Sequence, residues 1–289
     1  MEYIAREIEP HLRNMTTWFP IVFVGGARGC GKTSLLTRMF PDYHYLDLEN
    51  GAIAEKARAN PIGFLREHGS QLILDEVQNV PALFRALKVV ADESEKPAQF
   101  IISGSVNYLR LDSVTESLAG RVGLVHLPPL SFREMGLPLD EFLLYTSGDY
   151  PEEPSEANYT TFDLQASPSC EETKRYFWNT GLLGSDAADP AIFENFVVAE
   201  TAKNLTNQGA ENNLFWYRGV LVNGINPQTL TLTGIEPSTM PRVDCADAVN
   251  TVGDKLGVDA SRRQVIYQGS EDFMLDEVRF IPVETYLYA

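Results

Sequence analysis

The fold is decided by residues 26–33, GARGCGKT, which fit the pattern G-x-x-x-x-G-K-[ST] at every fixed position. In such a loop the backbone amides converge on phosphate oxygens, and side chains at the glycine positions would block that approach. An apolar run at residues 20–24 precedes the loop, and a helical pattern that begins near Lys32 follows it. That helix would present the partial positive charge of its N-terminus to the same anion. The stretch therefore predicts a phosphate-binding loop between a buried strand and a helix.

A loop of this pattern (Walker A) indicates ATP together with Mg²⁺. We expect Lys32 to reach the β- and γ-phosphates, and the Thr33 hydroxyl to ligate the metal. A Gly-rich turn that matches the pattern by chance is the alternative, and the flanking strand and helix argue against it. The residues predicted to bind the nucleotide are Gly26, Ala27, Arg28, Gly29, Cys30, Gly31, Lys32, Thr33 and Ser34.

A pair of carboxylates further along the chain completes the predicted site. Residues 72–74, Leu-Ile-Leu, are typical of a buried strand, and Asp75 and Glu76 follow it directly. Such a strand delivers Asp75 to the edge of the sheet where the phosphate loop lies, so we expect Asp75 to hold the metal through its water shell. Glu76 is expected to orient or deprotonate the attacking water. An apolar run followed by Asp-Glu is commonplace alone, and the preceding phosphate loop favours the functional interpretation.

Two further stretches carry candidate catalytic residues, each with an open alternative. Residues 101–105 are an apolar strand that ends in small polar residues, and Ser105 or Asn107 is expected to contact phosphate or water. A plain strand-to-loop turn explains these residues almost as well. Arg121 is a candidate arginine finger that stabilises transition-state charge, and a structural salt bridge is the competing interpretation.

Apolar runs alternate with helical patterns throughout the first half of the chain. Strand-like runs recur at residues 43–48, 72–74, 100–102 and 122–127, and a helical pattern begins at Pro81. This alternation predicts an α/β fold, with a mostly parallel P-loop NTPase sheet sandwiched by helices. We assign this ATPase domain to residues 1–147.

The amino-acid composition and the pattern of apolar residues change in the second half of the chain. Residues 148–174 are rich in Pro, Ser, Glu and Thr and are predicted to form an acidic linker. Residues 175–289 are predicted to form a smaller α+β domain, with one amphipathic helix at residues 191–205. Short strand-like runs follow that helix, at residues 214–217, 264–267 and 278–283.

Charge and cysteine usage narrow the classes of partner. The formal net charge is −17, of which residues 1–140 carry −3 and residues 141–289 carry −14. An acidic half repels phosphate backbones, so nucleic-acid binding is not expected. The 3 cysteines are scattered and lack metal-ligand spacing, which indicates free thiols in a reducing compartment. The sequence holds no apolar run of membrane-spanning length and opens without a signal-peptide pattern, so we expect a cytoplasmic protein away from membranes.

The residues quoted above also match a known family. Residues 3–134 resemble prokaryotic AAA-like P-loop ATPases that carry a C-terminal domain of unknown function. The resemblance implies an ATPase core with a nucleotide-bound metal, and it names no biological process. Its shared marks are residues 26–33, 45–47, 74–78, 104–105, 116–121 and 129–134.

Three short stretches of the second half are similar to parts of that family's C-terminal domain. Residues 176–183 resemble its opening motif, with Asn179 where an Asp is usual, and residues 194–200 and 215–218 resemble its main helix and the next strand. Family members carry a longer helical stretch between the halves. Residues 148–170 stand in its place here, which argues against an inherited role in DNA binding.

The family's C-terminal domain resembles restriction-endonuclease-like folds, whose site needs an Asp on one strand and Glu-x-Lys on the next. Here residues 219–227 hold no acidic residue, and the next apolar run ends in Glu236-Pro237-Ser238, with Ser238 in the lysine's place. One carboxylate cannot assemble a two-metal centre. We therefore expect a degenerate domain kept for packing or partner binding, with Glu236 on the surface or capping a turn.

The sequence is compatible with three functions. The first is Mg²⁺-dependent ATP binding and hydrolysis, in which Glu76 positions the water. The second is an ATP-binding switch or scaffold with little turnover, which signals through the acidic C-terminal domain to an unknown protein partner. An ATP-driven nuclease is the third and the least favoured. A homo-oligomer is possible, since an arginine finger can act on a neighbouring subunit.

Overall fold

A computed structural model describes residues 3–94, 96–104, 118, 120–139, 161–165, 173–178, 189–210, 212–226, 228–240 and 242–288. Contacts divide the chain into two compact units. The first unit comprises Met1–Leu130 with Thr206–Ala210, and the second comprises Ser131–Leu205 with Glu211–Ala289. Among the described residues, no helix has both the length and the apolar character that a membrane crossing requires.

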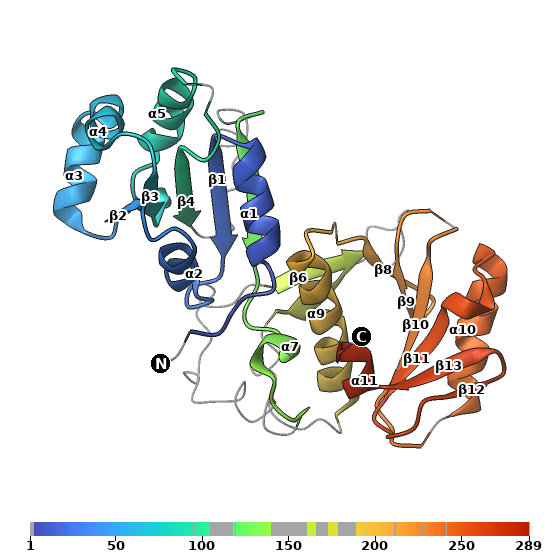
Figure 1. Ribbon diagram of the computed structural model, residues 1–289. Coiled ribbons are helices and arrows are strands. Elements are labelled where there is room, and N and C mark those ends of the chain that lie inside the picture. Colours follow the sequence, from blue (N-terminus) through green and yellow to red (C-terminus); the bar gives the residue numbers. More distant parts are fainter. Residues whose placement is uncertain are drawn as a thin grey trace. The chain divides into compact units, whose positions relative to one another are not determined.

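The first unit is built on a five-stranded parallel sheet (Figure 1). The strand order is β2-β3-β4-β1-β5, so the strand that leads into the phosphate loop has a neighbour on each side. The elements of this unit are α1 (Glu9–Trp18), β1 (Ile21–Gly26), α2 (Lys32–Met39), β2 (His44–Asp47), α3 (Gly51–Ala59), α4 (Pro61–His68), β3 (Leu72–Asp75), the 3₁₀ turn η1 (Val77–Asn79), α5 (Ala82–Ala91), β4 (Phe100–Gly104) and β5 (Val122–Leu127).

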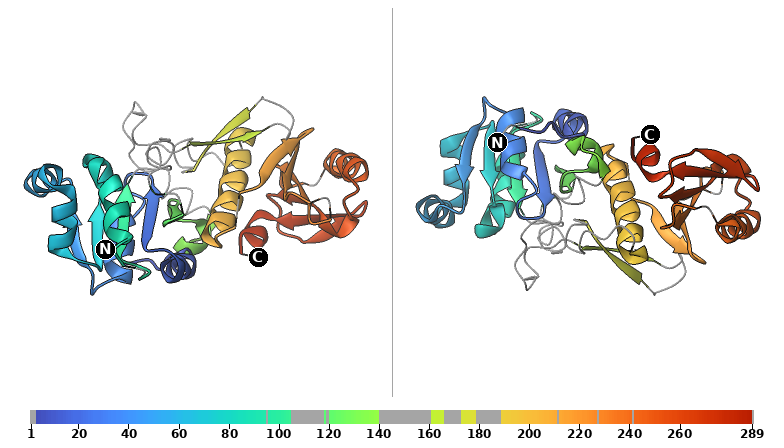
Figure 2. Two further views of the ribbon diagram at one scale, coloured as in Figure 1. Left: turned by 90° about the horizontal axis from the view of Figure 1, so that it is seen from above. Right: turned by 90° about the horizontal axis from the view of Figure 1, so that it is seen from below.

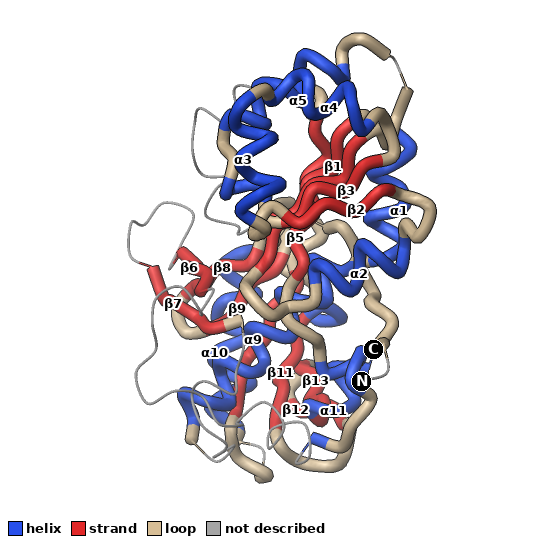
Figure 3. Tube along the Cα trace, turned by 90° about the vertical axis from the view of Figure 1, so that its left-hand side faces the viewer, coloured by secondary structure: helices blue, strands red, loops and turns tan. Residues whose placement is uncertain are grey.

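Helices cover both faces of this sheet, because its strands bury alternate side chains on opposite faces. Phe23 of β1 belongs to the core with α3, α4 and α5, whereas its neighbours Val22 and Val24 belong to the core with α1 and α2. Figure 3 shows these two groups of helices on either side of the strands. The predicted P-loop NTPase sheet between two layers of helices is confirmed.

The parallel register brings polar residues together at one edge of the sheet. Asp47 of β2 lies opposite Asp75 of β3, and Val24 of β1 lies opposite Ser103 of β4. Gly26 therefore delivers the phosphate loop to the carboxyl edge of the sheet, where β3 and β4 also end. Ligands of open α/β sheets bind at this edge.

The second unit is built on a six-stranded mixed sheet with the order β12-β13-β11-β10-β9-β8. A separate two-stranded antiparallel sheet pairs β6 with β7. The elements of this unit are α7 (Phe132–Met135), β6 (Thr161–Gln165), β7 (Thr173–Phe177), α9 (Pro190–Asn207), β8 (Leu214–Tyr217), β9 (Val220–Asn223), β10 (Thr231–Glu236), α10 (Val243–Leu256), η5 (Ala260–Arg262), β11 (Arg263–Tyr267), β12 (Phe273–Leu275), β13 (Val278–Pro282) and α11 (Val283–Tyr288).

Helices also lie on both faces of the six-stranded sheet. Helix α10 packs on one face through Val249 and Val252, and α9 and α11 pack on the other through Phe196 and Leu287 (Figure 2). The predicted α+β class of this region is confirmed. The sequence pattern predicted α9 but not α10, because α10 is rich in Val, Asp, Asn, Thr and Gly, which are weak helix formers.

A buried ion pair fixes the start of the second unit. The Lys203 ammonium donates to Glu200 at 2.6 Å, and the other oxygen of Glu200 accepts the backbone N–H of Phe132 at 2.8 Å. Glu200 and Lys203 are almost fully buried. Glu200 thus satisfies an unpaired amide in the first turn of α7 and anchors this helix to α9.

The structure differs from the predicted domain boundaries in two respects. The second unit begins at Ser131, whereas the sequence placed residues up to 147 in the first domain. Residues 161–165 and 173–174 lie in the predicted linker, yet they belong to strands β6 and β7. The alternating Phe162 and Leu164 explain this, because both side chains join a hydrophobic cluster with α9 and β8. The other residues of the predicted linker lie outside the described part of the chain.

Candidate nucleotide site

The phosphate loop runs from the end of β1 to the first residue of α2. Gly31, which precedes the helix, has a φ of 95°, in the left-handed region that favours glycine. Gly26 is needed for a different reason, since a Cβ there would lie 2.5 Å from the Leu127 carbonyl oxygen and 2.7 Å from the Cys30 sulfur. These positions hold the loop close against β5 and leave its amides free of side chains.

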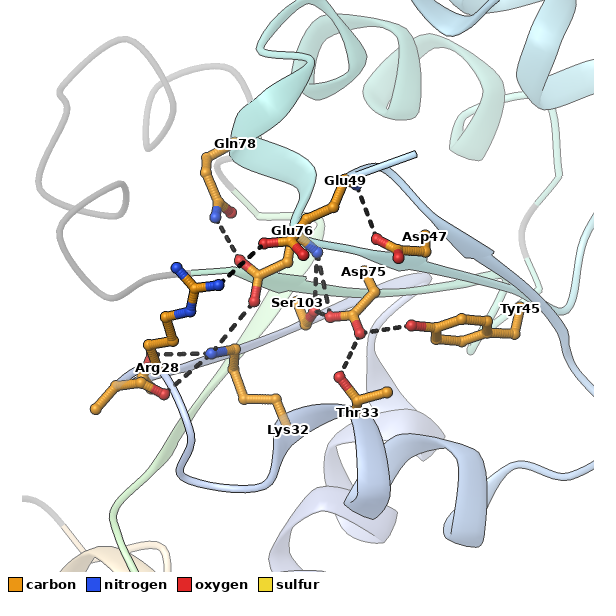
Figure 4. A network of polar contacts seen from close by, with 12 residues as sticks. Arg28, Lys32, Thr33, Tyr45, Asp47, Glu49, Asp75, Glu76, Gln78 and Ser103 are labelled. Atoms are coloured by element: carbon orange, nitrogen blue, oxygen red, sulfur yellow. Dashed lines mark hydrogen bonds and ion pairs between the residues drawn. The ribbon is translucent and has the colours of Figure 1, made fainter. Parts of the chain in front are cut away.

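Lys32 is the first residue of α2 and directs its ammonium group back over the loop (Figure 4). Its Nζ donates to the carbonyl oxygens of Gly26 at 3.2 Å and Ala27 at 3.1 Å, and lies 3.6 Å from Oε1 of Glu76. The side chain is only 5% exposed. A buried cation held inside the loop is suited to attract phosphate oxygens.

The carboxylate of Asp75 is the centre of the polar network in Figure 4. Its Oδ2 accepts the Thr33 hydroxyl at 2.5 Å and the Tyr45 hydroxyl at 2.8 Å. Its Oδ1 accepts the Ser103 hydroxyl and, at 3.2 Å, the backbone N–H of Glu76. Asp75 is 2% exposed, so these contacts replace the hydrogen bonds to water that the carboxylate loses on burial.

Glu76 lies beside the ammonium of Lys32 in a left-handed backbone conformation, with a φ of 54°. Such a conformation is uncommon for a residue with a side chain and costs of order 1–3 kcal/mol. Gln78 donates from its side-chain amide to Oε2 of Glu76, so both oxygens of the carboxylate face a polar partner. Glu76 keeps a side chain that is 22% exposed, which leaves it open to water.

The remaining loop residues have different surroundings. Arg28 is exposed and lies 4.0 Å from Glu49, and Ser34 is also exposed. Cys30 is buried, and burial raises the pKa of its thiol. In the loop, Arg28 and Cys30 therefore offer a surface cation and a protonated thiol.

Of the predicted catalytic residues, Arg121 is not brought into this network, and Ser105 is not described. Ser105, with Asn107, lies outside the described residues, and the hydroxyl that reaches Asp75 belongs to Ser103. Arg121 precedes β5, at the end of the sheet away from the loop, because Ile21 pairs with Val122 and Gly26 with Leu127. The length of the six-residue strand β1 separates the two ends, a span of about 20 Å.

Arg121 instead pairs with Asp92 at 2.5 Å, as the alternative salt-bridge interpretation expected. It cannot contact a nucleotide in the phosphate loop of its own subunit. A role for Arg121 on a neighbouring subunit stays a prediction.

Besides Ser103 and Glu49, further residues outside the predicted set contact its members. Tyr45 and Gln78 lie within the quoted family marks, which was the available signal, and they contact Asp75 and Glu76. Arg6 is 6% exposed and donates to the carbonyl oxygens of Cys30 at 2.9 Å and Pro128 at 2.7 Å. No local pattern marks Arg6, because both of these acceptors are backbone groups.

Burial shapes the chemistry of Tyr45 as well. Burial of the ring, followed by the hydrogen bond to Asp75, raises the pKa of the Tyr45 phenol. The phenol therefore stays protonated at neutral pH and acts as a hydrogen-bond donor. In that role it donates to Oδ2 of Asp75, the same oxygen that accepts the Thr33 hydroxyl.

The donor set fits Mg²⁺ bound together with a nucleotide. Thr33 gives its hydroxyl hydrogen to Asp75, which leaves the lone pairs of the Thr33 oxygen available to a cation. Within the described residues, no group of three or more His, Cys, Asp or Glu side chains forms a metal cluster. Mg²⁺ is commonly held by one or two protein oxygens and by phosphates rather than by such a cluster.

The predicted nuclease positions of the second unit form a different environment. Glu236 ends β10 and is 5% exposed, so the expectation that it lies on the surface is wrong. Its Oε2 accepts the Cys245 thiol at 2.8 Å, and its Oε1 accepts the backbone N–H of Ser238 at 3.2 Å, which caps the turn as the alternative expected. Burial and the hydrogen bond to Glu236 raise the pKa of Cys245 to about 12.

Comparison with known proteins identifies the class of the first unit. Residues 19–136 match the model of a family described as an AAA domain, a stretch that covers less than half of the chain. Fold, phosphate loop and family match agree: this part of the chain has the P-loop NTPase fold and is similar to AAA domains. The match ends at residue 136 and does not reach most of the second unit.

Relatives with curated sequences match this chain over less than half of its length. Uncharacterized proteins of Mycobacterium tuberculosis and Mycobacterium bovis are each 35% identical to it over 134 residues. The alignment covers 45% of this chain and 30% of each relative, so the match spans less than a third of the relatives' length.

Solved structures resemble this chain only weakly, with low TM-scores. Cdc6p from Pyrobaculum aerophilum has a TM-score of 0.31 and 19% identity, over 48% of this chain and 46% of its own. AMPPCP-bound DnaA from Aquifex aeolicus has a TM-score of 0.30 and 19% identity, over 52% of this chain and 51% of its own. Likenesses at such TM-scores support no conclusion about function.

Proposed function

We propose that this chain binds ATP with Mg²⁺ at the loop of residues 26–33 and hydrolyses it. The observation that carries the proposal is the hydrogen bond between Thr33 and Asp75, 2.5 Å long. The two residues lie on α2 and β3, far apart in the sequence, and meet beside the phosphate loop. A loop for phosphate, a hydroxyl for a cation and a buried carboxylate behind it are the parts that nucleotide hydrolysis requires.

Each residue has a separate task in this proposal. The loop amides and Lys32 hold the phosphates, and Thr33, supported by Asp75, ligates the cation. Bound Mg²⁺ would neutralise charge on the phosphate oxygens. Glu76 stands beside Lys32 with one oxygen near the ammonium and a partly exposed side chain, which suits it to orient a water molecule.

The competing function is an ATP-binding switch with little turnover. The contacts of Glu76 with Lys32 and Gln78 favour it, because a carboxylate held by two partners is less free to accept a proton. Signalling would then pass to a protein partner through the acidic second unit. A cytoplasmic location, a homo-oligomer and the lack of nuclease activity belong to the proposal in either case.

Phosphate release by the purified protein separates these two functions. We expect Glu76→Gln to lower the turnover number by about a hundredfold or more, since general bases contribute at least that factor. Affinity for Mg·ATP should change by less than about threefold, because Glu76 does not belong to the loop that binds the phosphates.

Glu67→Gln is the matched control, since Glu67 is an exposed carboxylate near the end of α4, which leads into the amino end of β3, whereas Glu76 follows the carboxyl end. Wild-type turnover in Glu67→Gln and its loss in Glu76→Gln would support hydrolysis. Nucleotide binding without phosphate release in the wild-type protein would instead support the switch.

A further inference from the structure

The acceptor capacity of Asp75 is fully used by its neighbours. A carboxylate offers about four lone-pair positions, two on each oxygen. Oδ1 accepts from Ser103 and from the backbone of Glu76, and Oδ2 accepts from Thr33 and Tyr45. The donors come from α2, β2, β4 and the residue after β3. Asp75 can therefore touch a cation directly only if it gives up one of these hydrogen bonds.

Among the donors to Asp75, Tyr45 does not belong to the phosphate-loop motif. It lies on the edge strand β2, opposite Ile73 of β3. Its ring packs against the core that α2 forms with the sheet, a core that includes Leu36 and Ile73. Because the ring is held by packing and the phenol has few rotatable bonds, the position of its hydroxyl is well defined.

We propose that Tyr45 is a positioning residue for the metal: its hydroxyl locks the Asp75 carboxylate in the orientation in which Oδ2 accepts the Thr33 hydroxyl. The inference rests on the proposed binding of Mg·ATP and assigns a role to a residue outside the phosphate loop. Tyr45 and Thr33 share one oxygen, so rotation of the carboxylate would break both hydrogen bonds together. With Thr33 fixed, its oxygen lone pairs keep one direction toward the cation.

This role predicts an effect on the metal and not on the nucleotide itself. No described contact joins Tyr45 to Lys32 or to the loop amides, so binding of metal-free ATP does not depend on its hydroxyl. Loss of a group that orients a metal ligand typically costs about 10–100-fold in metal affinity. Tyr45→Phe keeps the packed ring and removes only the hydrogen bond.

The test is equilibrium binding of a fluorescent ATP analogue, titrated with MgCl₂ and, separately, measured in EDTA. In Tyr45→Phe we expect the Mg²⁺ concentration at half-saturation to rise about tenfold, and affinity in EDTA to stay within about twofold of wild type. Tyr43→Phe is the matched control, because the Tyr43 hydroxyl also donates a 2.8 Å hydrogen bond, to the carbonyl oxygen of Ala98. This control should match the wild-type protein in both measurements.

Three results would overturn the inference while leaving ATP binding intact. These are an unchanged Mg²⁺ dependence in Tyr45→Phe, an equal shift in Tyr43→Phe, and a loss of affinity in EDTA as large as the loss with Mg²⁺. Failure of the wild-type protein to bind the analogue would instead refute the proposed function, and the inference with it. Thermal unfolding of both variants, expected to differ by a few degrees at most, checks that each is folded.

Discussion

At the scale of single residues, Arg6 is the unforeseen support of the phosphate loop. Its guanidinium joins the carbonyl of Cys30, in the loop, to that of Pro128, just beyond β5. A charged donor that satisfies two buried carbonyls contributes more than a neutral one. Arg6 thereby links the conformation of the loop to the segment that leads out of the first unit.

Replacing Arg6 by Met keeps most of the packed stem and removes both hydrogen bonds. We expect the free energy of unfolding to fall by about 2–3 kcal/mol, since two buried carbonyls lose a charged donor. Chemical denaturation of the full chain measures this value. Arg13→Met, which changes an exposed arginine on α1, should alter it by less than about 0.5 kcal/mol. Equal stability of the two variants would contradict the role given to Arg6.

Some residues of the site could be predicted from the sequence, and others could not. The loop glycines, Lys32, Thr33 and Asp75 were predictable, because fixed spacing and strand ends carry the chemistry of phosphate binding. Tyr45 and Ser103 became site residues only through the register of β2 and β4 beside β3, which one sequence does not determine. Which residues share an oxygen of Asp75 is therefore a result of the sheet order.

At the scale of elements, the edge strand β5 carries a histidine whose burial disfavours the protonated, charged form. His126 lies opposite Gly25 of β1, and burial lowers its pKa to about 4. The unfolded chain would bind a proton at this residue below about pH 6.5, whereas the folded chain resists it down to about pH 4. His126 therefore costs the folded state nothing above about pH 6.5. As the pH falls toward 4, the unfolded chain gains the proton first, and the folded state loses stability.

This linkage predicts a loss of about 2–3 kcal/mol in the stability of the first unit between about pH 6.5 and pH 4. Carboxylates also titrate in this range, so the comparison must be made with His126→Gln, which cannot take up the proton. Denaturant unfolding at a series of pH values should give a shallower decline in His126→Gln. Parallel curves for the two proteins would contradict the prediction.

Several elements could not be predicted from the sequence, for physical reasons. The strands β1, β3 and β4 of the first unit are fully buried apolar runs, which makes them easy to recognise. Strand β6 is short and lies among polar residues, so its alternation does not stand out from a linker. Helix α10 packs one face through alanine, valine and glycine, but most of its residues are weak helix formers, so helix propensity does not mark it.

At the scale of the whole molecule, the chain joins a P-loop unit that is similar to AAA domains to an acidic α+β unit. The charge is concentrated in the second half, at −14 for residues 141–289, and strand β10 there ends in a buried Glu236 that binds a thiol and a backbone amide. The predicted degeneracy of the nuclease-like site and the partner of this unit stay predictions. The proposal for the whole chain therefore depends on its nucleotide site.

The measurement that tests the central claim most directly is a calorimetric titration of ATP with Mg²⁺ into the wild-type protein and Lys32→Ala. Lys32 is the buried cation of the loop, so its loss should weaken binding by at least about thirtyfold, equivalent to about 2 kcal/mol. Lys56→Ala removes an exposed lysine of α3 and should bind ATP as the wild-type protein does. Equal affinities in Lys32→Ala and Lys56→Ala would contradict the assignment of residues 26–33 as the nucleotide site.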